Sequence, residues 1–303
     1  MNNKILPVII LLIAIFSGNA CINGVPDQQT SQEQLIIVTS ILPLADFVEH
    51  VGGDKVEVIV MIPPGANPAT YEPTASQLKA VSSAEIYVEV GSGLLFEEVW
   101  LDKICSANPD MLVVDTSKGI TLMEMEEHHH EEKYSGQNND ERGMDPHIWL
   151  SPANAEIMVQ NICDGLIRID PANETYYEQN KEQYISDLEV LDSDINQSLS
   201  GFKNRTFMVF HPSWGYFARD YNLTMIAVEI EGKEPSVSDM AHLIKTAKEN
   251  DINVIFVQPQ FSTKSAEVIA KEIGGSVIPA DPLAKDYLLN LREVTNSFTK
   301  SLT

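Results

Sequence analysis

Residues 35–61 read LIIVTSILPLADFVEHVGGDKVEVIVM. The β-branched run at 35–39 predicts a strand, the amphipathic segment 44–51 predicts a helix, and the run at 56–61 predicts a second strand. A strand, a helix and another strand in this order are typical of a parallel sheet that is covered by helices on both faces. The alternation continues with an expected helix at 76–82 and expected strands at 86–90 and 111–114.

The same alternation of expected strands and helices occurs again in the second half of the chain. Its expected strands lie at 206–210, 225–228, 254–257 and 276–278, with helices between them. Between the two halves, the segment 173–199 carries its apolar residues along one helical face, and a helix of that length is about 40 Å long. We therefore expect an α/β fold of two lobes, each with a parallel sheet flanked by helices, joined by one long rigid helix.

The expected domain boundaries follow from these elements and from the polar stretch that precedes them. Residues 22–33 are rich in Gln, Ser, Thr, Gly and Pro, which is typical of a flexible linker. We expect a signal peptide at 1–20, a flexible tether at 21–33, an N-terminal lobe at 34–170 with a His-rich loop at 124–143, a connecting helix at 171–204 and a C-terminal lobe at 205–303.

The N-terminus has the pattern of an export signal. Lys4 precedes twelve apolar residues at 5–16, and small residues then lead to Cys21. Twelve residues are fewer than the roughly 20 that a membrane-spanning helix needs. We expect an exported protein in the periplasm or at the outer face of the cytoplasmic membrane, held there by a lipid on Cys21 or by its tether; ordinary signal cleavage near Cys21 is the alternative. In such surroundings Cys105 and Cys163 either pair or remain free thiols.

The charge balance excludes one class of partner. Lys and Arg number 20 and Asp and Glu number 44, which gives a formal net charge of −24 at pH 7. A surface this acidic repels phosphate backbones, so we expect no nucleic-acid binding. The zinc-hydrolase pattern HExxH and the serine-hydrolase pattern GxSxG do not occur in the sequence, so we expect that the chain is not an enzyme.

Two of the seven histidines stand where a ligand site is expected. His147 lies in DPHIWL, His211 lies in FHPSWG directly after an expected strand, and Asp281 follows the last expected strand in ADPL. All three stand at the edges of elements, where the two lobes would face a shared cleft near the carboxyl ends of their strands. Two imidazoles and a carboxylate suit Zn²⁺ or a neighbour such as Mn²⁺. His50 and His242 lie on expected helices, and no role is assigned to them.

An acidic run in the first lobe holds the other three histidines. Residues 124–133 read EMEEHHHEEK, with His128, His129 and His130 in the middle, and they have no apolar period. This pattern predicts a mobile loop, and clustered histidines and carboxylates bind transition metals loosely. The alternative is a solvated charge run that takes no part in binding.

Five short motifs resemble those of a known family. They are PGANPATYEP at 64–73, DPHIWL at 145–150, FHPSWGYF at 210–217, GKEPS at 232–236 and ADPL at 280–283. Together they make residues 35–301 similar to the metal-binding solute-binding proteins of ABC transporters, in particular to the zinc-uptake type. The resemblance implies two α/β lobes joined by a long rigid helix, a metal held between them, and delivery of that metal to a membrane permease and its ATPase. It also implies a His-rich acidic loop at the place where residues 128–130 stand.

The resemblance assigns metal-ligand roles to His147, His211 and Asp281. In the manganese-type relatives a carboxylate stands at the position of His211. A histidine there favours Zn²⁺ over Mn²⁺, because imidazole is the softer ligand.

One position departs from the family pattern. Ala69 stands where the family has its first histidine ligand, and a methyl group cannot coordinate a metal. Water can complete the site, as it does at open zinc sites. The second alternative is that another side chain of the protein supplies the fourth ligand. The third is that the protein no longer binds a metal tightly. The candidates for that fourth ligand are Glu72, His128, His129 and His130.

The predicted function is that of the extracytoplasmic substrate-binding component of an ABC transporter. It captures a divalent transition metal in the cleft between its lobes, with Zn²⁺ ahead of Mn²⁺, and the metal is the transported ligand rather than a catalytic cofactor. The alternative is a surface adhesion protein on the same scaffold with weakened metal binding. Because the long helix leaves little hinge freedom, we expect small lobe motions and loop ordering rather than wide closure on binding.

Overall fold

The computed structural model of the chain describes residues 34–125, 143–230 and 232–302. Outside the described residues lie the expected signal peptide and tether, the lipidation site Cys21 and the histidines His128, His129 and His130. Within the described ranges, no helix combines the length and the apolar character needed to cross a membrane.

The first lobe is built on a parallel four-stranded sheet with the order β2-β1-β3-β4. Ile37 and Val38 in β1 are both fully buried, as expected of a strand that is covered on both faces. The strands are β1 (Leu35–Thr39), β2 (Val56–Val60), β3 (Ile86–Glu89) and β4 (Leu112–Asp115). They are connected by α1 (Leu42–Gly52), the 3₁₀ turn η1 (Gly53–Lys55), α2 (Ala75–Val81) and α3 (Leu95–Ala107).

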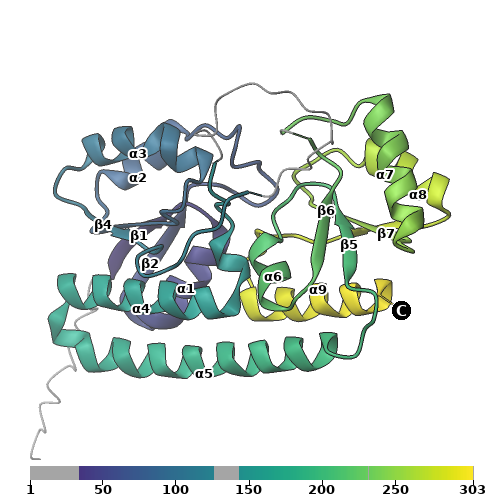
Figure 1. The fold of residues 1–303 in the computed structure, drawn as a ribbon. Coiled ribbons are helices and arrows are strands. Elements are labelled where there is room, and N and C mark those ends of the chain that lie inside the picture. The colour runs from purple at the N-terminus through teal and green to yellow at the C-terminus, as the bar shows by residue number, and fades with distance from the viewer. Residues whose placement is uncertain (1–33, 126–142, 231, 303) are drawn as a thin grey trace, which may run out of the picture. The chain divides into compact units, whose positions relative to one another are not determined.

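The second lobe repeats this topology with the order β6-β5-β7-β8, again all parallel. Helices α7 and α8 pack over one face of its sheet, and α9 packs over the other (Figure 1). The strands are β5 (Thr206–Val209), β6 (Thr224–Ala227), β7 (Val254–Val257) and β8 (Ser276–Pro279). The helices are α6 (Gly215–Asp220), α7 (Val237–Glu249), α8 (Lys264–Ile273) and α9 (Tyr287–Ser301).

Between the sheets the chain forms the 3₁₀ turn η2 (Ile148–Leu150), the helix α4 (Pro152–Ile169), the turn η3 (Pro171–Asn173) and the helix α5 (Glu174–Leu199). Ser151 caps α4 by accepting the Asn154 N–H at 3.1 Å. Helix α5 has 26 residues and packs against α1, α4 and α9, so it runs along both lobes (Figure 1). The predicted fold class, two α/β lobes joined by one long helix, is confirmed.

The two lobes share one hydrophobic core along α5. Phe47 on α1 packs against Tyr184 on α5 and Tyr287 on α9, with ring centroids 6.0 and 4.9 Å apart. The same cluster continues under the second sheet, where the rings of Phe207 and Phe298 lie 4.7 Å apart. A separate cluster fills the space between that sheet and the pair α7 and α8. The shared core opposes wide hinge motion, because opening would expose buried aromatic surface to water.

Both described cysteines are free thiols, so the structure does not pair Cys105 with Cys163. Cys163 on α4 is buried, and burial raises the pKa of its thiol to about 11. A thiol with so high a pKa is inert at neutral pH, which is typical of a packing role.

A buried carboxylate lies within the shared core. The Tyr184 hydroxyl donates a hydrogen bond of 2.8 Å to Asp46 on α1, and His50 stacks on the Tyr184 ring. Burial raises the pKa of Asp46, whereas the Tyr184 hydrogen bond and the nearby His50 act to lower it. The hydroxyl therefore compensates for part of the cost of burying this group.

We predict that Tyr184→Phe lowers the free energy of unfolding by about 1–3 kcal/mol, because the buried Asp46 carboxylate loses its hydroxyl donor. The matched control is Tyr176→Phe on the same helix, whose hydroxyl meets the exposed Asp54 N–H at 3.4 Å. Urea unfolding followed by circular dichroism compares the two variants. An equal loss of unfolding free energy in both variants would contradict the stabilising role of the hydrogen bond between Tyr184 and Asp46.

Candidate metal site

The first predicted ligand, His147, immediately precedes η2 and is 7% exposed. Its Nδ1 lies 2.7 Å from Asp145 Oδ1, and the same oxygen accepts the His147 backbone N–H at 2.9 Å. Because a carboxylate accepts hydrogen bonds, Nδ1 carries the ring proton and Nε2 keeps its lone pair. Burial lowers the pKa of His147, although the Asp145 charge opposes this shift. The result is a neutral ring, which is the form that binds a metal.

The second predicted ligand, His211, stands just after β5 in the other lobe. Its Nδ1 lies 3.0 Å from Glu229 Oε2, which leaves Nε2 free by the same argument. Gln258 holds the backbone of His211: its Nε2 donates to the carbonyl at 2.7 Å and its Oε1 accepts the N–H at 3.3 Å. The imidazole also stacks on the Phe261 ring, with centroids 4.8 Å apart. These contacts hold His211 in one orientation.

The two histidines meet between the lobes. Their ring centroids are 5.3 Å apart, and the ring planes are inclined by 73°. Both rings line a cavity of about 700 Å³ whose walls come from both lobes. An imidazole with Nδ1–H held by a carboxylate and Nε2 free is the usual arrangement at protein metal sites. The structure thus brings two of the predicted ligands together in a form that suits a metal.

A buried carboxylate fixes the cavity wall next to the first histidine. Glu97 on α3 accepts the N–H groups of Val90 at 2.7 Å and Gly91 at 3.0 Å, and its burial raises its pKa. The turn that Glu97 holds continues to Ser92, whose hydroxyl donates to the Pro146 carbonyl at 2.7 Å. The position of the predicted ligand His147 is therefore linked to the core of that lobe by two hydrogen-bonded steps.

Asp281 is placed differently from the histidines. It follows β8, but it is not among the residues that line the cavity. Its Oδ1 accepts hydrogen bonds from Gln260 Nε2 at 3.0 Å and from the Leu283 N–H at 2.9 Å, and Gln260 itself lines the cavity. Across the ranges that the structure describes, no three His, Cys, Asp or Glu side chains are grouped so that they could hold one metal. Asp281 thus lies one hydrogen bond behind the cavity wall.

Of the candidates for a fourth ligand, only Glu72 falls within the described ranges. Glu72 is exposed and is not part of the cavity lining, whereas Ala69 is part of it. The other candidates, His128, His129 and His130, lie outside the described residues.

Sequence reasoning missed the residues that hold the histidines. Asp145 carried a readable signal, because it stands two residues before His147 in the motif DPH. Glu229 carried none, because it is separated by 18 residues from the histidine that it contacts. Gln258 and Gln260 follow β7 and were not singled out, although Gln258 holds the backbone of His211 and Gln260 lines the cavity.

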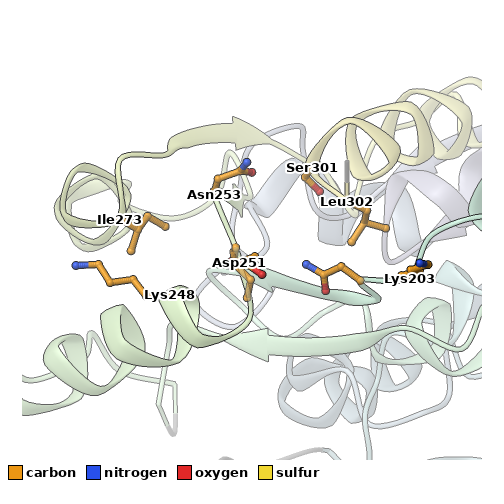
Figure 2. Close-up of a pocket in the computed structure, with 9 residues that line it drawn as sticks. Lys203, Lys248, Asp251, Asn253, Ile273, Ser301 and Leu302 are labelled. Carbon is orange, nitrogen blue, oxygen red and sulfur yellow. The ribbon is translucent and has the colours of Figure 1, made fainter.

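A second cavity, of about 650 Å³, lies in the second lobe (Figure 2). Its lining includes Lys203 and Lys248, whose ammonium groups repel a metal cation, together with Asp251 and Asn253. These residues precede or border the amino ends of β5 and β7, whereas ligands of parallel α/β sheets bind at the carboxyl ends. The histidine-lined cavity is therefore the candidate metal site.

Two α/β lobes with a shared core along one long helix, and with an imidazole from each lobe in the cleft between them, are the arrangement of a bilobed solute-binding protein that takes a metal. The chain belongs to the family described as zinc-uptake complex component A periplasmic (ZnuA), whose sequence pattern matches residues 37–301. This finding confirms the predicted resemblance.

One curated protein and three solved structures show how far the similarity extends. The high-affinity zinc uptake system protein ZnuA of Bacillus subtilis (strain 168) is 32% identical over 270 residues, which cover 87% of this chain and 82% of that protein. A crystal structure of ZnuA is 44% identical with a TM-score of 0.83, covering 89% of this chain and 100% of the other. A zinc-bound ZnuA deletion mutant is 42% identical with a TM-score of 0.81, covering 89% and 99%. A mutant structure of the laminin-binding adhesin Lmb of Streptococcus agalactiae is 25% identical with a TM-score of 0.76, covering 88% and 99%.

Gly215, the first residue of α6, lies against the carboxylate that orients His147. A Cβ at Gly215 would stand 2.5 Å from Asp145 Oδ2. We predict that Gly215→Ala displaces Asp145, turns His147 and weakens metal binding by about tenfold. Gly201→Ala is the matched control, because a Cβ there meets no atom within 4 Å. Isothermal titration calorimetry measures both affinities, and an unchanged affinity in Gly215→Ala would argue against the orienting role of Asp145.

Proposed function

We propose that this chain is the extracytoplasmic zinc-binding component of an ABC uptake system. It takes up Zn²⁺ in the cleft between its lobes and presents the ion to a membrane permease that is driven by an ATPase. The observation that carries the proposal is the pair His147 and His211, one from each lobe, with ring centroids 5.3 Å apart and each Nδ1 beside a carboxylate. Family membership supports the same function.

In this proposal the Nε2 atoms of His147 and His211 replace two waters of the hydrated ion, and Asp281 adds a carboxylate oxygen. Asp281 uses its Oδ1 for the hydrogen bonds from Gln260 and Leu283, and its Oδ2 accepts none from the described residues. A small shift of the loop after β8 would bring this carboxylate to the ion. Imidazole nitrogen favours Zn²⁺, whereas Mn²⁺ prefers oxygen ligands, so we expect weaker binding of Mn²⁺.

The contacts between the lobes support loop ordering rather than wide closure on binding. Trp149 Nε1 donates to the Pro282 carbonyl at 2.7 Å, and the Tyr216 hydroxyl donates to the Asp145 carbonyl at 3.2 Å. Lys285 and Glu49 add a surface ion pair of 2.7 Å between the loop before α9 and helix α1. With these contacts in place, the ion acts on the segments that border the cleft, and α5 stays fixed.

Adhesion is the second candidate function. It is favoured by the match to the laminin-binding adhesin, although the ZnuA structures are more similar to this chain. A function in adhesion alone does not explain why two buried or half-buried imidazoles, each held by a carboxylate, lie in one cleft. Zinc capture explains that arrangement directly.

We propose further that a lipid on Cys21 anchors the mature chain at the outer face of the membrane. The support is the order of the N-terminal sequence: Lys4, the apolar run 5–16, small residues, and then Cys21. The polar residues 22–33 would then act as a flexible tether between the anchor and the first lobe.

We predict that Cys21→Ser releases the protein from the membrane fraction, because the hydroxyl cannot take the thioether-linked lipid. Mass spectrometry of the wild-type N-terminal peptide should show an acylated residue 21. Cys105→Ser is the matched control and should leave the membrane fraction unchanged. An unmodified wild-type peptide would remove the anchor from the proposal and leave zinc capture standing.

We predict that the wild-type soluble chain, stripped with a chelator, binds one Zn²⁺ and that His147→Ala/His211→Ala weakens this binding by at least about a hundredfold, because both imidazole ligands are lost. His242→Ala removes an exposed histidine on α7 and is the matched control. Calorimetric titration with Zn²⁺ and with Mn²⁺ measures all three proteins. Equally weak binding in the wild type and the double variant would overturn zinc capture in the cleft and leave adhesion as the leading candidate.

A further inference from the structure

The cavity that holds the two histidines is much larger than a metal ion requires. Its volume is about 700 Å³. Pockets for small organic ligands range from about 300 to 1,000 Å³, whereas a water molecule takes up about 30 Å³ in the liquid. An ion with its immediate ligands therefore fills only part of this space.

The walls of the cavity have the composition of a small-molecule site. Apolar side chains make much of the surface, with polar groups placed between them, as is typical of pockets that orient an organic ligand. The apolar part includes Leu94, Leu95, Leu122, Phe261 and Leu283. The polar part includes Asn67, Thr70, Ser92 and Gln260. Gly91 and Gly93 also line it, with φ of 78° and 95°, so the backbone of this turn comes to the surface without a side chain.

The described walls offer few atoms to the ion itself. The two imidazole Nε2 atoms are free, but Glu229 is engaged with His211, and Asp281 is held by Gln260. At Ala69 the wall presents a methyl group. Zinc accepts four or five ligands. Even when Asp281 joins the two histidines, one or two coordination positions face the unfilled part of the cavity.

We propose that the cargo is Zn²⁺ in complex with a small bidentate chelator of the amino-acid type. The chelator coordinates the ion through its amino nitrogen and one further donor, a carboxylate oxygen or a side-chain nitrogen, and its remaining atoms occupy the cavity between the turn at 91–93 and Phe261. This inference rests on the proposed function, because it takes the same two histidines as protein ligands. It extends that function by naming the chemical class of the transported species.

Charge selects this class of chelator over polycarboxylates. Glu98 lines the cavity, the chain has a formal net charge of −24, and neither Lys nor Arg is among the described lining residues. A complex of Zn²⁺ with one histidinate is a net cation, whereas a complex with citrate is a net anion. The acidic surroundings attract the first and repel the second.

Native mass spectrometry of the full soluble chain, loaded with Zn²⁺ in the presence of free L-histidine, tests the proposal directly. The expected result is a complex of one protein, one zinc and one histidine. At matched free zinc, L-histidine should lower the apparent Kd for zinc at least about tenfold, which is the reciprocal coupling expected of two ligands that bind together. Citrate should give no ternary complex.

Two substitutions at Ala69 distinguish the effect of an added zinc ligand from the effect of a smaller cavity. Ala69→His adds a protein ligand, so this variant should bind zinc tightly without retaining L-histidine. Ala69→Leu fills part of the cavity without adding a ligand, so it should lose the ternary complex and keep the weaker binding of zinc alone. His147→Ala/His211→Ala should lose zinc in both forms. Circular dichroism checks that each variant is folded.

The outcomes distinguish this inference from the function on which it rests. If the wild type binds zinc tightly alone, and L-histidine only competes for the ion, the chelate proposal is overturned and zinc capture stands. The same holds if histidine is retained equally by the wild type and by Ala69→Leu. If the wild type binds zinc neither alone nor with L-histidine, both proposals fail together.

Discussion

The aromatic contact among Phe47, Tyr184 and Tyr287 is the constraint on which the rest of the molecule depends. It joins α1 of the first lobe, the long helix α5 and α9 of the second lobe. Helix α1 follows β1 and α9 follows β8, so this contact packs a helix of one lobe directly against a helix of the other. The packing of the two lobes, which carry His147 and His211, is therefore held by the core of the protein itself.

At the two histidines, the groups that would bind the ion are different from the groups that orient the rings. Asp145 and Glu229 each accept the Nδ1 proton of one ring and so fix which ring nitrogen faces the cavity, while Gln258 and the turn held by Glu97 set the backbone position. Burying these carboxylates costs free energy that hydrogen bonds only partly return. That cost is understandable at a site whose imidazole rings must be oriented before the ion arrives. A cargo site must also release its ion, and Asp281 as the proposed third ligand, held outside the cavity by other hydrogen bonds, is suited to reversible coordination.

Much of the fold could be predicted because its signals are local. The β-branched run 254–257 coincides with β7, and the apolar stripe at 173–199 differs from α5 by one residue at its start. The pairing of His147 with His211 followed from the rule that parallel strands bring their carboxyl ends to one edge. The position of Asp281 behind Gln260 did not follow, because side-chain direction is decided by hydrogen bonds between segments that are 21 residues apart. The contact of Glu229 with His211 also joins two separate segments, and the 18-residue spacing between them gives no sign of it in the sequence.

The two sheets have the same strand order, since β2-β1-β3-β4 and β6-β5-β7-β8 each place the second strand at an edge beside the first. The described part of the chain therefore consists of two topologically equivalent halves, as would arise from the repetition of one four-strand unit. In this comparison His147 and Asp281 are counterparts, because each follows the fourth strand of its half. Asp281 comes two residues after β8, whereas His147 comes 32 residues after β4. The extra length lies wholly in the connection after β4. The first half therefore has room for a long segment before its cleft residue, whereas the second half reaches its cleft residue directly after the strand.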